Sequence, residues 1–136
     1  MKRFLFISFL CVISSISFAQ VGVNNDCASA FNFTPVTTCG ATAYNLRNAT
    51  ASGGVFGASN YDAWYNFTTP AGVTSVTITI SGYGSSLNNT NTFVQAFNST
   101  SCPTDLSTLI ATSSSGSSTL SLTGLTPNTQ YYFRVY

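Results

Sequence analysis

Apolar and polar residues alternate along most of the chain after residue 30, and clusters of Gly, Asn and Ser interrupt the alternation about every 8 to 12 residues. The clearest segment is 73–81, where Val76, Ile78 and Ile80 alternate with threonines. Such alternation gives a strand one buried and one solvated face. Further strands are expected at 31–36, 42–46, 63–68, 92–98, 106–112, 118–123 and 131–136. About eight short strands predict an all-β chain with two packed antiparallel sheets.

The first residues follow a different pattern. Lys2 and Arg3 precede an apolar run that ends at Ile16, and Ser17 and Ala19 supply the small residues before a cleavage point near Ala19–Gln20. This is the pattern of a signal peptide. The run is shorter than the roughly 20 residues of a membrane-spanning helix, and no later stretch comes closer. We therefore expect residues 1–19 to be a signal peptide, and residues 20–136 to form a single secreted domain without a membrane span.

Charge is scarce, and its scarcity removes whole classes of chemistry. Charged residues make up 5% of the chain, there is no His or Glu, and the only Lys is Lys2. Catalytic His-containing sites, Lys Schiff bases and paired Glu residues are thus excluded. After removal of the signal peptide, Arg47 and Arg134 oppose three Asp residues, which leaves no basic footprint for nucleic acid. The expected protein is not an enzyme and does not bind nucleic acid.

Three cysteines follow the signal peptide, at Cys27, Cys39 and Cys102. An exported chain meets an oxidising compartment, and a bridge from Cys27 to Cys39 would close a short loop. We predict this disulfide from spacing and compartment. Cys102 is then left without a partner, and three alternatives follow: a free buried thiol, a bridge between two chains, or a partner outside the sequence.

Two stretches resemble known families. The segment with Leu125, Pro127 and Tyr131 resembles the tyrosine-corner segment of fibronectin type III modules, where a Tyr hydroxyl bonds to nearby backbone. The order of motifs over about 24–136 resembles the pre-peptidase C-terminal (PPC-like) domains of bacterial proteins with type IX secretion. The matching motifs are Asn25-Asp26-Cys27, Asp62-Ala63-Trp64-Tyr65-Asn66-Phe67, Val73 to Ile80, Phe93 to Phe97, Ser101-Cys102 and Tyr131 to Tyr136.

The resemblance implies a jelly-roll or fibronectin III/Ig-like sandwich, with Tyr131 in the corner role. Ala111 stands where relatives often place the Cys that would pair with Cys102, and the chain stops where they usually continue through a last strand. The resemblance therefore implies a lost bridge and a domain that lacks its last strand.

Several residues are candidates for core or site roles. Trp64 and Phe67 are expected in the sandwich core, because a strand aromatic more often fills a core than stacks on a sugar. Tyr61 and Tyr83 lie in or beside Gly-rich loops and are candidates for stacking on a ligand or for turn packing. Arg134 alternates with Phe133 and Val135, so we expect it to face solvent, with an exposed ion pair to an Asp as the plain alternative.

A calcium site is a further candidate. Asn25, Asp26 and Asp62 carry the oxygen ligands that Ca²⁺ prefers, and some PPC-like domains bind calcium. Two carboxylates make a weak site, however, and both Asp residues equally well cap turns.

These observations lead to one expected function and two alternatives. The expected function is a non-catalytic secreted binding or adhesion module for a polysaccharide, cell-surface polymer or cell-surface protein. The alternatives are the N-terminal non-catalytic part of a larger secreted hydrolase, and a structural matrix subunit in which Cys102 bridges two copies. The oligomeric state is open.

Overall fold

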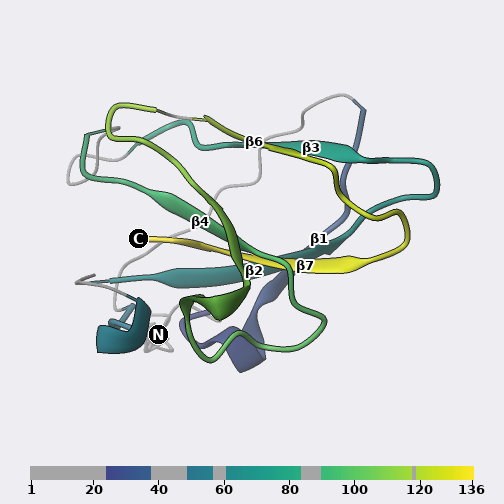
Figure 1. Ribbon diagram of the computed structural model, residues 1–136. Helices are drawn as coiled ribbons and strands as arrows, with labels where there is room; N and C mark the ends of the chain where they lie inside the picture. The colour runs from purple at the N-terminus through teal and green to yellow at the C-terminus, as the bar shows by residue number, and fades with distance from the viewer. Residues whose placement is uncertain (1–23, 38–48, 57–60, 84–89, 118) are drawn as a thin grey trace, which may run out of the picture.

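The computed structural model describes residues 24–37, 49–56, 61–83, 90–117 and 119–136 (Figure 1). The signal-peptide segment and the expected strand 42–46 lie outside these residues. The described strands are β1 (Phe31–Phe33), β2 (Ala63–Thr68), β3 (Ser75–Thr79), β4 (Val94–Phe97), β5 (Leu109–Thr112), β6 (Thr119–Thr123) and β7 (Gln130–Val135). Three 3-10 helices accompany them: η1 (Cys27–Ser29), η2 (Gly54–Phe56) and η3 (Leu106–Thr108). The expectation of an all-β chain is confirmed.

The strands form a five-stranded sheet in the order β1-β2-β7-β4-β5 and a two-stranded sheet of β3 and β6. Every pair is antiparallel except β1 with β2, which is parallel. The centre of the large sheet is the pairing of β2 with β7, which runs without interruption from Ala63 opposite Val135 to Thr68 opposite Gln130. Figure 1 shows β3 and β6 lying over one face of the large sheet.

One apolar cluster joins the two sheets. The small sheet contributes Ile78, Leu120 and Leu122. In β6 these leucines are buried while Thr119, Ser121 and Thr123 are exposed, as period-two alternation requires. The large sheet contributes alternate residues of β2, β4 and β7, namely Ala63, Tyr65, Phe67, Val94, Ala96, Tyr131, Phe133 and Val135. Residues far apart in sequence thus share one core, as expected for two facing sheets.

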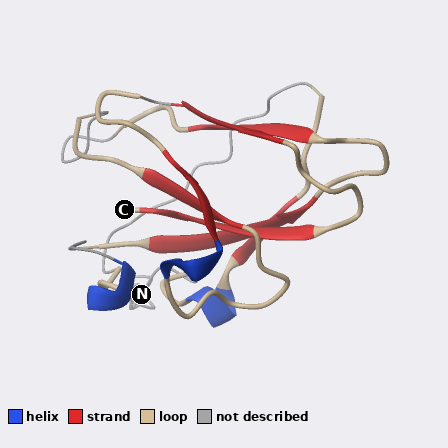
Figure 2. Ribbon diagram, in the orientation of Figure 1, coloured by secondary structure: helices blue, strands red, loops and turns tan. Residues whose placement is uncertain are grey.

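The other face of the large sheet is buried as well. Phe56, Trp64 and Phe97 form a second cluster there, and Cys27 and Ala30 of the N-terminal segment pack against it. Figure 2 shows the three short helices on this side of the large sheet, away from β3 and β6. The N-terminal segment and the loop before β2 therefore cover the face of β2, β4 and β7 that would otherwise meet water.

The chain enters β7 through a tight corner. The Tyr131 hydroxyl accepts a hydrogen bond from the Thr126 backbone N–H at 2.9 Å, the side chain-to-backbone contact that defines a tyrosine corner. Asn128 has a φ of 55°, a left-handed conformation that Asn tolerates better than most residues. The buried Thr69 hydroxyl accepts from the Thr129 N–H at 3.0 Å and donates to the Thr126 carbonyl at 2.6 Å. The end of β2 is thereby tied to the corner.

A side-chain cap stabilises the start of η3. The Asp105 side chain caps this turn by accepting a hydrogen bond from the Ser107 N–H at 2.7 Å. Hydrogen bonds from the Ser107 side chain and then its backbone hold the pKa of Asp105 below the ordinary value of 3.8. The residue has a structural role in its turn.

Candidate functional site

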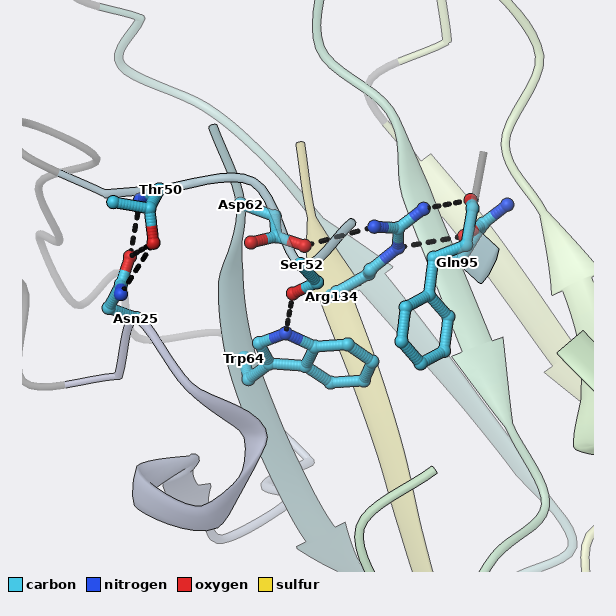
Figure 3. A network of polar contacts seen from close by, with 8 residues as sticks. Asn25, Thr50, Ser52, Asp62, Trp64, Gln95 and Arg134 are labelled. Atoms are coloured by element: carbon cyan, nitrogen blue, oxygen red, sulfur yellow. Dashed lines mark hydrogen bonds and ion pairs between the residues drawn. The ribbon is translucent and has the colours of Figure 1, made fainter. Parts of the chain in front are cut away.

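A buried polar network lies on the outer face of the large sheet, centred on Arg134 of β7. The Arg134 side chain is 0% exposed and forms an ion pair with the equally buried Asp62, with 2.9 Å between Nη1 and Oδ2. Its Nε donates to Gln95 Oε1 at 2.8 Å, and its Nη2 donates to the Phe56 carbonyl oxygen. Figure 3 shows Asp62 and Gln95 approaching the guanidinium from opposite sides. Each acceptor thus takes a different part of the guanidinium.

Aromatic rings complete the surroundings of this guanidinium. Its central carbon lies 4.4 Å from the centre of the Tyr136 ring and 5.1 Å from that of the Phe56 ring. Tyr136 in turn stacks on Phe93, with 5.6 Å between the ring centres. A desolvated cation over aromatic faces is attracted by their quadrupoles. Arg134 is therefore held by charge, hydrogen bonds and aromatic faces together.

The expectation that Arg134 faces solvent is wrong. Alternation places it correctly on the opposite face from Phe133 and Val135, but that face is covered by the segments around η1 and η2. Its pairing with an Asp is confirmed, at a buried site instead of a solvated one. A buried charge has to be paired and hydrogen-bonded to persist, which Arg134 achieves.

The network anchors the loop that precedes β2. Asn25 Nδ2 donates to Thr50 Oγ1 at 2.9 Å, and Asn25 Oδ1 accepts from the Thr50 N–H. The Trp64 indole N–H donates to Ser52 Oγ at 2.8 Å (Figure 3). Together with the two bonds from Arg134, these contacts fix the backbone on both sides of 57–60, which lie outside the described residues. Residues 49–56 and 61–62 are from here on called the anchored loop.

Tyr61 belongs to this anchored loop and is 59% exposed. It immediately precedes Asp62, whose side chain is fixed inside the network. The Asp62 side chain is fully buried and that of Tyr61 is mostly exposed, so the two neighbouring side chains lie on opposite sides of the chain. Tyr83, the other stacking candidate, is half-buried. Of the two stacking candidates, Tyr61 is thus the more exposed.

The predicted core aromatics lie in different places. Trp64 is 1% exposed and packs in the outer cluster, 5.3 Å from Phe56 and 5.6 Å from Phe97 between ring centres. Phe67 is buried between the sheets, where it stacks on Tyr131 at 5.7 Å. Neither ring is available to stack on a ligand.

The three calcium candidates are engaged separately. Asp62 pairs with Arg134, the Asn25 amide binds Thr50, and Asp26 is exposed at the start of η1 without a side-chain cap bond. Among the described residues no group of three Asp, Glu, His or Cys side chains comes together, and Asp62 Oδ1 has no hydrogen-bond partner there. Because Arg134 already neutralises Asp62, this arrangement does not provide a donor set suited to Ca²⁺.

The cysteine pairing differs from the expected one. Cys27 is bonded to Cys102, with 5.6 Å between their Cα atoms and a sequence separation of 75. The predicted Cys27–Cys39 bridge and the free thiol at Cys102 are therefore wrong; Cys39 lies outside the described residues. The physical reason is that η1 packs on the outer face of the large sheet, where Cys27 meets the turn that follows β4. Cys102 is not available to bridge two copies.

In comparisons with protein-family models, curated proteins and solved structures, the chain has no significant match. The likeness to PPC-like and fibronectin type III modules stays a prediction from motifs. The helices described in the structure include none long and apolar enough to cross a membrane.

Sequence reasoning missed four members of this region: Thr50, Ser52, Phe56 and Gln95. Only Gln95 has a local signal, because it is a lone amide between Val94 and Ala96 in an otherwise apolar strand. A polar residue in such a position needs a partner. The others depend on contacts between segments distant in sequence.

Proposed function

We propose that this chain is a secreted, non-catalytic binding or adhesion module, and that it contacts a neutral polysaccharide or cell-surface polymer through Tyr61 on the anchored loop. Secretion rests on the signal-peptide pattern of residues 1–19. The observation that carries the binding proposal is an aromatic ring, 59% exposed, next to a residue that an ion pair holds inside the protein.

An exposed tyrosine suits a sugar ligand on physical grounds. Its ring offers a large apolar face for the C–H groups of a pyranose, and its hydroxyl offers a hydrogen bond. Arg134 holds Asp62, the residue that follows Tyr61, before any ligand binds, so ordering this residue costs no further entropy on binding. Loops held by a rigid scaffold are the usual place for binding residues.

The carboxylates favour binding over catalysis. Glycoside hydrolysis ordinarily uses two carboxyl groups on either side of the bond that is cleaved. Asp62 is sealed inside the protein by Arg134, whereas Asp26 and Asp105 are exposed in separate turns around η1 and η3. With no Glu or His in the sequence, the described residues offer no such pair. The anchored loop can therefore recognise a ligand through the Tyr61 ring and through hydrogen bonds, without a pair of carboxylates.

The test is binding to a panel of neutral insoluble polysaccharides, such as cellulose, chitin and xylan, measured by depletion of the protein from solution. Truncating a central aromatic contact costs about 2 kcal/mol, or roughly 30-fold in Kd. We expect Tyr61→Ala to weaken binding by that factor and Tyr61→Phe to retain most of it. Leu106→Ala, at another exposed apolar residue, is the matched control and binds normally.

Two results would contradict the proposal. If Tyr61→Ala binds as tightly as the unmodified chain, or if no polysaccharide of the panel is bound, the site is not the one proposed. If the purified chain releases soluble sugars from a bound polymer and one point substitution abolishes the release, the module is catalytic.

A further inference from the structure

The anchored loop exposes a second apolar side chain besides that of Tyr61. Val55, the middle residue of η2, is 59% exposed, the same fraction as Tyr61. Among the large apolar residues that the structure describes, only Val36 is more exposed. A single exposed apolar residue needs no explanation, but two on one short loop form a candidate contact surface.

One guanidinium anchors the neighbours of both side chains. Val55 precedes Phe56, whose carbonyl oxygen accepts a hydrogen bond from Arg134 Nη2. Tyr61 precedes Asp62, whose carboxylate accepts from Arg134 Nη1 at 2.9 Å. Consecutive Cα atoms are about 3.8 Å apart, so each exposed residue lies one such step from a residue that this cation holds. Val55 and Tyr61 therefore flank the same buried point of the protein.

Burial shows how the loop divides its side chains. Phe56 is buried in the outer cluster and Asp62 is buried in the network, whereas Val55 and Tyr61 are mostly in solvent. The anchored loop thus uses one residue of each neighbouring pair to attach itself to the sheet. The other residue of each pair leaves an apolar group on the outer surface.

These two groups discriminate between sugars by stereochemistry. The Tyr61 ring offers an apolar face, and Val55 offers methyl groups on a β-branched side chain with restricted χ1. A β-linked sugar unit whose ring substituents are all equatorial has axial C–H bonds, so both faces of its ring are apolar. An axial hydroxyl group places an oxygen on one face, and covering this oxygen with methyl groups removes its water without a replacement partner.

We propose that Val55 and Tyr61 together form the contact surface of the polysaccharide site, and that this surface selects β-linked polymers whose ring substituents are all equatorial. The inference rests on the proposed function. Tyr61 stacks on one sugar unit and Val55 covers the C–H groups of a neighbouring unit, so the ligand is a chain and not a single sugar. Cellulose, chitin and xylan have this stereochemistry, whereas mannan carries one axial hydroxyl group on each unit.

The experiment is calorimetric titration with two soluble β-1,4-linked hexasaccharides, cellohexaose and mannohexaose, which differ in the orientation of one hydroxyl group per unit. We expect the unmodified chain to bind cellohexaose at least tenfold more tightly, because an axial hydroxyl group loses its hydrogen bonds to water on the apolar surface. Val55→Thr keeps the shape of the side chain and replaces one methyl group by a hydroxyl group. It should weaken cellohexaose binding about fourfold, the effect of one lost apolar group, and narrow the preference between the two ligands.

The matched control is Val36→Thr, the same substitution at an exposed valine outside the anchored loop. This variant should bind both hexasaccharides as the unmodified chain does. Equal or reversed affinities for the two hexasaccharides, or an affinity for cellohexaose that Val55→Thr leaves unchanged, overturn the inference. Binding to cellulose without binding to cellohexaose also overturns it, because six consecutive units contain the whole proposed contact.

Failure of this inference is distinguishable from failure of the proposed function. If Tyr61→Ala weakens polysaccharide binding while Val55→Thr does not, the binding module stands and its contact surface excludes Val55. If no polysaccharide or hexasaccharide is bound, the proposed function fails and this inference fails with it.

Discussion

Replacing Arg134 by methionine removes the cation that neutralises a fully buried carboxylate. Asp62 is then left with no positive partner, and its Oδ1 already has no hydrogen bond among the described residues. Removing one partner of a buried ion pair costs about 3–5 kcal/mol, because the other charge stays desolvated. Since a domain of this size is stable by about 5–15 kcal/mol, Arg134→Met should remove a large part of that stability.

The opposite replacement should cost less. In Asp62→Asn the guanidinium keeps Gln95 Oε1, the Phe56 carbonyl and the two rings that flank it. The amide oxygen of the new side chain can still accept from Arg134 Nη1, so what is lost is the negative charge opposite the guanidinium. Because the remaining acceptors and rings still surround the cation, we expect a loss below the ~3–5 kcal/mol of a buried charge left without its partner. The two changes are also coupled. Adding Asp62→Asn to Arg134→Met removes the stranded charge and should raise stability, although the same change lowers the stability of the unmodified chain.

Urea unfolding at neutral pH measures these differences. Trp64 is the only tryptophan, is buried and lies 5.3 Å from Phe56 between ring centres, so its fluorescence reports the surroundings of the network. The midpoint and slope of each transition give the free energy of unfolding of the unmodified chain, the two single variants and the double variant. Circular dichroism should give the same midpoints if unfolding is two-state.

The sign of the Asp62→Asn effect decides the outcome. If this change destabilises Arg134→Met as much as it destabilises the unmodified chain, the two residues act independently and the ion pair is not the centre of the network. Equal losses from the two single variants would likewise contradict the asymmetry derived from the surroundings of Arg134.

Three further outcomes are expected. Tyr131→Phe leaves the corner N–H without its acceptor and should lower the free energy of unfolding by about 1–2 kcal/mol in urea titrations, whereas Tyr132→Phe should have little effect. Replacing Cys27 and Cys102 together by serine opens a loop of 75 residues and should cost about 4 kcal/mol, seen as a lower Tm that reducing agent does not lower further. The pKa of Asp105 is lowered in the folded state, so its carboxylate contributes fully to folding stability above its unfolded pKa. This contribution is lost as pH falls through the folded pKa. Asp105→Asn should therefore lack this part of the decrease in Tm in a series between pH 6 and pH 2.

The strands were predictable because one face of each meets a continuous apolar core. The predicted segment 63–68 has the bounds of β2, and the alternation in β6 gives its burial correctly. The ends of the strands were predicted less accurately. The predicted strand 106–112 begins with η3, and only its last four residues form β5. The parallel pairing of β1 with β2 was not predictable, because alternation carries no strand direction.

The candidate site was predictable only in part. Tyr61 was a candidate because of its place beside a Gly-rich loop, but the network beneath it depends on a second covered face that period-two alternation does not reveal. The pairing of Cys27 failed for the same reason, because spacing favours a near partner while the outer face brings Cys102 close. Arg134 did carry a signal: it is one of few charges in the chain and stands among aromatic residues at the end of the sequence.

The bond between Cys27 and Cys102 also determines how the protein would respond to mechanical force. A pull applied on either side of the described chain passes from Cys27 directly through the sulfurs to Cys102, so the residues between them, with β1 to β4, carry no tension. Of the described residues, only those before Cys27 and after Cys102 can lengthen, which shortens the maximum extension by about 260 Å at roughly 3.5 Å per residue. In a module attached to a surface under flow, β5, β6 and β7 would bear the strain, and the anchored loop would keep its bonds to Arg134 only as long as β7 stays paired with β2.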